Sequence, residues 1–193
     1  MPTPFPPTAE ILRYLWGAWR LVRRDEQGME VFGDTVDDFW QSFWAAALVA
    51  PLYISVSLVR YAFETGDGSF VRFIGAEAAT YANLWLAFPF IMLFVARGID
   101  REARYIRFIV AYNWASVLQS IFYTAVVYIG MSGLLPPGTA NFMGFLALIA
   151  ILVYTWFITR TALDIPGLMA GGLVAIDLTL GLVIQSIGEG LKG

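Results

Sequence analysis

Long runs of apolar residues alternate with short polar breaks along most of this chain. Five runs are long enough to cross a hydrocarbon core of roughly 30 Å as helices, at about 1.5 Å of rise per residue. Residues 39–188 are therefore predicted to form one transmembrane domain, with spans at about 39–59, 78–96, 108–134, 141–158 and 167–187. Pro51 and Pro89 lie inside the first two runs and predict kinks or locally opened backbone ladders.

The residues ahead of the first span follow other patterns. Residues 1–7 are rich in proline and predict a flexible tail, and residues 25–38 form an acidic connector with turns at Gly28 and Gly33. Residues 8–24 predict an amphipathic helix capped by Thr8. One face of this helix carries Ile11, Leu12, Leu15, Trp16, Trp19 and Val22, and the other carries Glu10, Arg13, Gly17, Arg20 and Arg24.

This first helix is too short and too charged to cross a membrane. It suits a position in the headgroup plane, with tryptophans in the lipid and arginines at phosphates. Docking on the cytoplasmic ends of the spans and binding of a partner protein are the alternatives. Residues 189–193 form a C-terminal tail after the last span.

Composition strengthens the membrane interpretation. Apolar residues make up 59% of the 193 positions, charged residues 14%, and the mean hydropathy is +0.67. A soluble domain lies nearer half apolar and a quarter charged. The predicted fold class is therefore all-α: a polytopic transmembrane helix bundle of about five spans with an N-terminal amphipathic interfacial helix.

Two absences from the sequence narrow the chemistry. The chain has no Cys and no His, which excludes disulfides, thiolate zinc sites, Ser-His or Cys-His catalysis and His-ligated cofactors. We therefore expect no cofactor, no metal and no enzymatic activity. The net charge of −3 and the lack of a basic cluster of the nucleic-acid-binding type argue against a nucleic-acid partner.

Basic residues predict the orientation. With the N-terminus inside, nine of the twelve Lys and Arg residues fall on the inner side, and Arg60, Arg72 and Lys192 fall outside. Cytoplasmic segments carry such an excess, so the N-terminus is predicted to be cytoplasmic and the C-terminus outside. The short connections favour a bacterial inner membrane.

Asp177 is an acidic residue deep inside the fifth apolar run. A charge there is expensive, so Asp177 should face the bundle, be protonated or have a partner. We expect its partners on a polar face of the third span, within a network of Asp177, Asn113, Gln119, Tyr123 and Gln185. An interhelical hydrogen bond and an ion- or proton-handling role are both open for this carboxylate.

A stripe of small residues runs along the fifth span, formed by Gly167, Gly171, Ala175 and Thr179 at four-residue spacing. Such a stripe lets a second helix approach closely. That helix belongs either to the same chain, which is the default, or to another subunit. Asp177 points away from the stripe.

Basic residues also cluster between the second and third spans, where Arg97, Arg101 and Arg104 share one helical face. Together with Arg13, Arg20 and Arg24, they are candidates for contact with anionic lipid headgroups or a protein partner. Charge that only sets the topology explains them equally well.

The layout of a cytoplasmic N-terminus and five close spans resembles the Ypt-interacting (Yip) family of small membrane proteins and its bacterial relatives. Phe108-Ile109-Val110-Ala111-Tyr112-Asn113, at the start of the third span, is similar to that family's aromatic and small entry to this span. Trp156 late in the fourth span and Ala170 at the head of the fifth are similar too. The resemblance implies a membrane-organising or trafficking role through protein contacts, and no site residue follows from it.

Three functions are considered on this basis. The first is a non-enzymatic membrane scaffold, accessory subunit or assembly factor that works through helix packing, with membrane lipids and another membrane protein or itself as partners. The second is a small transporter or channel, as a monomer or an oligomer, that uses Asp177 and the polar face of the third span. A lipid-modifying enzyme is disfavoured, because no nucleophile–base arrangement is evident.

Overall fold

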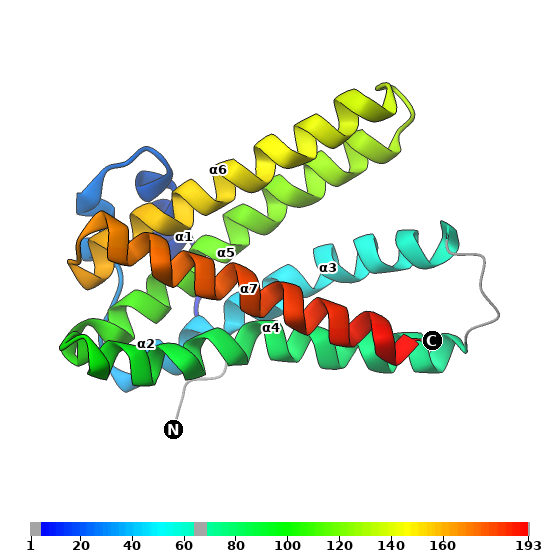
Figure 1. The fold of residues 1–193 in the computed structure, drawn as a ribbon. Coiled ribbons are helices and arrows are strands. Elements are labelled where there is room, and N and C mark those ends of the chain that lie inside the picture. The colour runs from blue at the N-terminus through cyan, green and yellow to red at the C-terminus, as the bar shows by residue number, and fades with distance from the viewer. Residues whose placement is uncertain (1–4, 64–68, 193) are drawn as a thin grey trace.

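The computed structural model describes residues 5–63 and 69–192, and the regular structure within these ranges is entirely helical (Figure 1). A short N-terminal helix and a 3-10 turn precede five long helices. The elements are α1 (Thr8–Val22), η1 (Glu26–Val31), α2 (Val36–Ser42), α3 (Trp44–Phe63), α4 (Phe70–Gly98), α5 (Glu102–Met131), α6 (Pro137–Leu163) and α7 (Gly167–Lys192).

Five helical segments are long and apolar enough to cross a membrane, which confirms the predicted number of spans. They contain 26 to 30 residues with a mean hydropathy of 1.3 to 2.2. The shortest is about 39 Å long at about 1.5 Å per residue. The first of them, Val36–Ala62, comprises α2 and most of α3. Several helices extend past the predicted apolar runs, because charged residues such as Glu77 and Arg104 continue the helix beyond its hydrophobic part.

Pro51 and Pro89 both lie inside continuous helices. Tyrosines from neighbouring helices supply hydrogen bonds close to these prolines. The Tyr81 hydroxyl donates to the carbonyl of Ala46, one turn before Pro51, at 2.6 Å, and the Tyr105 hydroxyl donates to the carbonyl of Pro89 at 2.9 Å. Neighbouring helices thus satisfy backbone groups near the prolines, as a membrane interior requires.

The helices converge at one end of the bundle and separate at the other (Figure 1). The core end holds the first turns of α3, α5 and α7 and the last turns of α4 and α6. Toward the opposite, divergent end, the α5–α6 hairpin leans away from α3, α4 and α7, while α4 and α7 stay side by side. The fully buried side chains of Phe108, Ile109, Trp114, Ile158 and Leu163 place the tightest packing at the core end.

Helix α1 is docked onto the core end. Tyr14 stacks on Trp114 with ring centroids 5.1 Å apart, and the Tyr154 hydroxyl donates to the carbonyl of Ala18 at 2.7 Å. Burial raises the pKa of Tyr14 to about 12, so its hydroxyl stays protonated and donates to Asp38 at 3.2 Å. Docking, one of the alternatives from the sequence, is therefore what the structure describes.

The buried face of α1 differs from its predicted apolar face. Tyr14, Gly17, Ala18 and Leu21 are buried, whereas Leu12, Trp16, Trp19 and Val22 are exposed. The reason is that small residues allow a close approach: a Cβ at Gly28 of η1 would lie only 2.8 Å from the carbonyl oxygen of Gly17. The helix is thus docked by one side and presents an aromatic and aliphatic surface on another.

Candidate functional site: a cleft between helix hairpins

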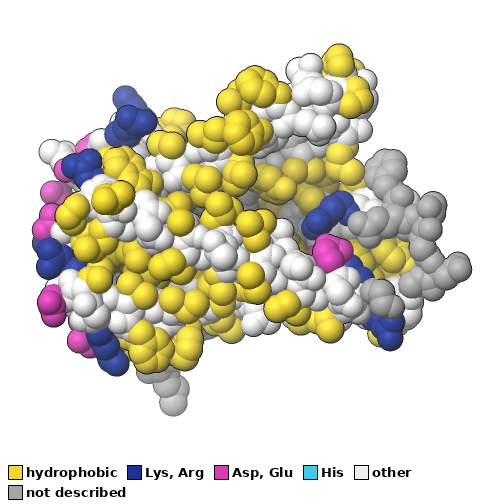
Figure 2. All heavy atoms as spheres, in the orientation of Figure 1, with side chains coloured by type: hydrophobic (Ala, Val, Ile, Leu, Met, Phe, Trp, Pro, Cys, Tyr) yellow, Lys and Arg dark blue, Asp and Glu magenta, His cyan; other side chains and the backbone are white. Residues whose placement is uncertain are grey.

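A cleft of about 450 Å³ lies where the α5–α6 hairpin leaves the rest of the bundle. We call it the hairpin cleft. The space-filling view shows the molecule hollowed between the α5–α6 hairpin and the other long helices (Figure 2). Its lining comes from all five long helices. The polar lining residues are Tyr53, Arg60, Gln119, Ser120, Tyr123, Thr124 and Gln185, and the apolar ones are Val49, Val56, Leu84, Val127, Met131 and Ile151.

Three of the five residues predicted to form the intramembrane network meet in this cleft. Gln119 and Tyr123 lie one turn apart on α5, and Gln185 faces them from α7. The amide of Gln119 donates to the hydroxyl of Thr155 on α6 at 3.1 Å, which fixes the amide at the floor of the cleft. Tyr123 is 49% exposed.

Asn113 lies elsewhere, in the packed core end. It is fully buried, and its amide nitrogen donates to the hydroxyl of Ser42 at 2.8 Å. Ser42 in turn donates to the carbonyl of Phe39 at 2.7 Å. Asn113 therefore ties α5 to α2 and does not line the hairpin cleft.

Asp177 also lies apart from the cleft lining. The hydroxyl of Tyr112 on α5 donates to its two carboxylate oxygens at 3.0 and 2.9 Å, and the Tyr112 ring packs on Phe88 at 4.8 Å. The predicted span supplies the partner, but Tyr112 was not among the residues that the sequence proposed as partners of Asp177. This contact between α5 and α7 is the kind of interhelical hydrogen bond that the structural alternative for Asp177 predicts.

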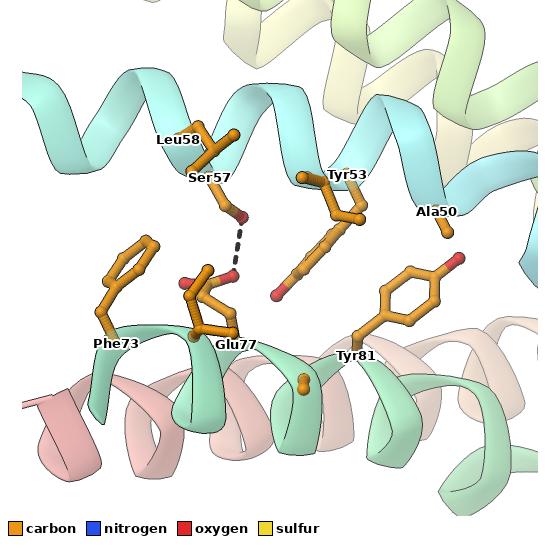
Figure 3. Close-up of a pocket in the computed structure, with 10 residues that line it drawn as sticks. Ala50, Tyr53, Ser57, Leu58, Phe73, Glu77 and Tyr81 are labelled. Carbon is orange, nitrogen blue, oxygen red and sulfur yellow. Dashed lines mark hydrogen bonds between the residues drawn. The ribbon is translucent and has the colours of Figure 1, made fainter. Parts of the chain in front are cut away.

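A second carboxylate, Glu77 of α4, was missed from the sequence. Lys192 at the end of α7 lies 2.6 Å from one of its oxygens, and the hydroxyl of Ser57 donates to the other at 2.7 Å. Tyr53 points its hydroxyl toward the same carboxylate (Figure 3). The side chains of Glu77 and Lys192 are only 9% and 14% exposed, so this ion pair joins α4 to α7 inside the bundle.

Glu77 forms part of the wall of a smaller cavity of about 260 Å³ between α3 and α4 (Figure 3). The rest of that wall is almost entirely apolar. The predicted second span begins one residue after Glu77, so this carboxylate lay just outside the predicted transmembrane segments. The four-residue spacing of Phe73, Glu77 and Tyr81, which places all three on one face of α4, was the available signal.

Among the described residues, the small-residue stripe of α7 packs closely within the chain at its first position alone. Trp156 donates its indole N–H to the carbonyl of Gly167 at 2.8 Å, and a Cβ on Gly167 would lie 3.0 Å from the indole ring. Gly171 is half-buried with open space beside it, and Ala175 and Thr179 are exposed. The buried side of α7 runs instead through Ala170, Leu173 and Val174, so the stripe faces mainly outward.

Ala175 and Thr179 line a shallow hollow of about 410 Å³ on this outward side. Its other walls are apolar residues of α4 and α7: Ile91, Ile176, Leu180 and Val183. We call Gly171, Ala175 and Thr179 with this hollow the outward face of α7.

The arginines proposed for lipid or partner contact are largely paired within the chain. Charged side chains gather at the core end, with a second, smaller group toward the divergent end (Figure 2). Ion pairs join Arg13 to Glu10 at 3.3 Å, Arg20 to Asp25 at 2.6 Å, Arg97 to Glu102 at 3.1 Å and Arg104 to Asp164 at 3.1 Å. Arg24 is exposed and has a left-handed backbone with φ of 59°.

Asp164 connects the two loops at the core end. Its backbone is left-handed, with φ of 51°, and terminates α6. Arg101 donates to its carbonyl oxygen at 3.3 Å from two guanidinium nitrogens, and Arg104 pairs with its carboxylate. A further pair joins Arg107 to Asp34 at 2.6 Å. These contacts give the basic cluster a part in holding the core end together, beyond setting topology.

Among the described residues, carboxylates do not gather in groups of three or more that could hold a metal ion. No protein-family model, no curated protein and no solved structure matches the chain. The resemblance to the Yip family therefore stands on the five-span layout and the few residues quoted for it, without a family assignment.

Proposed function

We propose that this chain is a non-enzymatic integral membrane scaffold or accessory subunit that binds another membrane protein through the outward face of α7. The carrying observation is that Ala175 and Thr179 are exposed and line a hollow rimmed by larger apolar side chains. Within a bilayer, helices associate through close packing at small residues, because lipid offers no hydrophobic driving force between them.

The outward face of α7 suits a transmembrane helix for two further reasons. Thr179 already donates its hydroxyl to the carbonyl of Ala175 at 2.7 Å, so covering it leaves no donor unsatisfied. The Glu77–Lys192 ion pair also holds α7 against α4. The surface is thus preformed, which lowers the ordering entropy lost on binding.

A crosslinking experiment tests this proposal. A photo-reactive residue is placed at position 179, and a matched one at Leu146, which is 48% exposed on α6. We expect one discrete protein adduct from position 179, none from position 146, and loss of the adduct when Ala175→Leu fills the hollow while the fold is retained. An adduct that survives Ala175→Leu, or equal adducts at both positions, contradicts the proposal. A chain-to-chain adduct identifies a second copy as the occupant and overturns the assignment to another protein.

For the membrane and the orientation, we propose a bacterial inner membrane with the core end in the cytoplasm. The nine basic residues at the core end support this orientation. The chain has no native cysteine, so Gly98→Cys at the core end and Gly138→Cys at the divergent end give a matched pair, each with open space around it. An impermeant maleimide should label position 138 in intact cells and position 98 only after lysis, and the reverse pattern refutes the orientation.

A small transporter is the second candidate, because the hairpin cleft brings Gln119, Tyr123 and Gln185 together. Two observations weigh against it: Asp177 is bonded to Tyr112 away from the cleft lining, and the fully buried Trp114 and Ile109 close the core end. Asp177→Asn separates the two functions in reconstituted vesicles. If Asp177→Asn folds but loses a proton- or ion-coupled flux, the result favours the transporter and contradicts the scaffold proposal.

A further inference from the structure

The hairpin cleft carries an inference that is independent of the scaffold role. We propose that it binds an amphiphile with one anionic headgroup, such as an anionic phospholipid, with Arg60 contacting the anion. Arg60 lies in the last turn of α3 and is the one charged residue in the cleft lining among the described residues. It makes no ion pair with any described acid.

The cleft requires a polar occupant. Ser120, Tyr123 and Gln185 line it without a hydrogen bond to any described group, and the amide oxygen of Gln119 is left over once its nitrogen has bonded to Thr155. Polar groups inside a membrane that lack partners are strongly disfavoured, so a bound molecule or water must satisfy them. Neutral donors and acceptors around a single cation suit a headgroup that combines a phosphate with hydroxyls.

The shape and the walls favour an amphiphile over a small soluble anion. Met131 at the mouth and Gln119 at the floor lie twelve residues apart on α5, or about 18 Å at about 1.5 Å per residue. The volume of about 450 Å³ falls in the range of roughly 300–1,000 Å³ typical of small-molecule sites. Val56, Val127 and Ile151 supply apolar wall beside the polar groups. A headgroup with the first part of an acyl chain fills such a space better than a free ion.

The test uses the purified full chain carrying Ser120→Cys, a small change at a lining position in a chain without other thiols. The rate of maleimide alkylation at this cysteine is measured against increasing short-chain phosphatidylglycerol. Matched titrations use phosphatidylcholine of the same chain length and inorganic phosphate. We expect phosphatidylglycerol to slow the alkylation in a saturable way, and the other two to do so only at far higher concentration.

Arg60→Gln should weaken the protection by at least about tenfold, the loss expected for one charge-assisted hydrogen bond. Arg72→Gln makes the same charge change at the same end of the molecule but outside the cleft lining. It should leave the protection by phosphatidylglycerol unchanged. Circular dichroism and gel filtration of each variant separate lost binding from lost folding.

Three results would overturn the inference. Equal protection by phosphatidylcholine shows that the cleft binds acyl chains without selecting for the charge of the headgroup. Protection by inorganic phosphate at equal concentration shows a soluble-anion site. No protection by any ligand in a folded protein shows a water-filled cleft. None of these results bears on the outward face of α7, so the scaffold proposal stands or falls separately.

Discussion

The buried ion pair between Glu77 and Lys192 gives a prediction whose magnitude follows from the structure. Lys192→Met leaves the Glu77 carboxylate without its cationic partner. The carboxylate is 9% exposed and would keep only neutral partners, the hydroxyls of Ser57 and Tyr53. Removing one partner of a buried pair costs about 3–5 kcal/mol. Because Lys192 lies in the last turn of α7, where water is near, we expect the lower end, about 3 kcal/mol of unfolding free energy.

The reciprocal change should cost less. In Glu77→Gln, Lys192 keeps Glu189 at 2.7 Å, and the new amide can still accept from Ser57. We expect a loss of about 1.5–2 kcal/mol, the lower part of the range of about 1.5–3 kcal/mol for a hydrogen bond to a charged group. Glu189→Gln is the matched control: its side chain is 53% exposed, so its pair with Lys192 contributes at most about 1 kcal/mol.

The double variant Glu77→Gln with Lys192→Met tests whether the two side chains are energetically coupled. It removes the buried charge altogether, so it should be more stable than Lys192→Met alone. The assay is equilibrium unfolding of purified protein in mixed micelles with increasing denaturing detergent. If the two single losses add to within about 0.5 kcal/mol in the double variant, the side chains are not coupled and the reasoning fails.

Three further predictions concern α1 and its surroundings. Tyr14→Ala removes a buried ring stacked on Trp114 and should cost about 3–5 kcal/mol of docking free energy, measured by hydrogen exchange of α1; unchanged exchange would contradict the docking. The double change Trp16→Ser and Trp19→Ser alters exposed residues, so the unfolding free energy should stay within about 0.5 kcal/mol of the wild-type value. The fraction of tryptophan fluorescence that brominated lipids quench should fall, and an unchanged fraction would argue against lipid contact of these two residues. The hydrogen bond from Arg20 lowers the pKa of Asp25 below 3.8. The contribution of this pair to the α1–η1 contact should therefore be complete above that pH and be lost as pH falls through the lower folded value; faster pepsin cleavage in η1 should report this, and Asp25→Asn should abolish the dependence.

The number of spans could be predicted because hydropathy depends only on local sequence. The helix ends could not, because helix continuation does not depend on hydropathy. Glu77 and Arg104 lie within helices yet outside the predicted apolar runs. The Glu77 site was missed for this reason, because a carboxylate outside the predicted spans is not considered as a buried group.

The buried face of α1 illustrates a second limit. In a soluble protein the apolar side of a helix is the side that packs, but lipid is as apolar as a protein core. Tyr14, Ala18 and Leu21 lie beside Trp16 and Trp19 around the helix, and hydrophobicity cannot rank the two sides. The tertiary contacts with Trp114 and η1 decide which side faces inward.

The partner of Asp177 shows that a sequence pattern cannot single out one residue among neighbours on a helix. The sequence indicated the correct helix and proposed Asn113, Gln119 and Tyr123 on its polar face as partners, whereas Tyr112 makes the bond. Neighbouring residues on a helix differ by about 100° in direction. A pattern can therefore assign a polar face to a span, but only the packing of α5 against α7 decides which residue of that face meets the carboxylate.

Helix α7 contributes to both proposed binding surfaces, and its last turns are held closely against α4. Gln185 faces the hairpin cleft, while Thr179 lies on the outward face of the same helix. Lys192 anchors the helix to Glu77, and Gly188 lies against Thr80 of α4 without room for a Cβ. If α7 rotated or slid, both surfaces would change together. The position of one helix, set by a buried ion pair near its last turn, thus determines the geometry of both proposed sites.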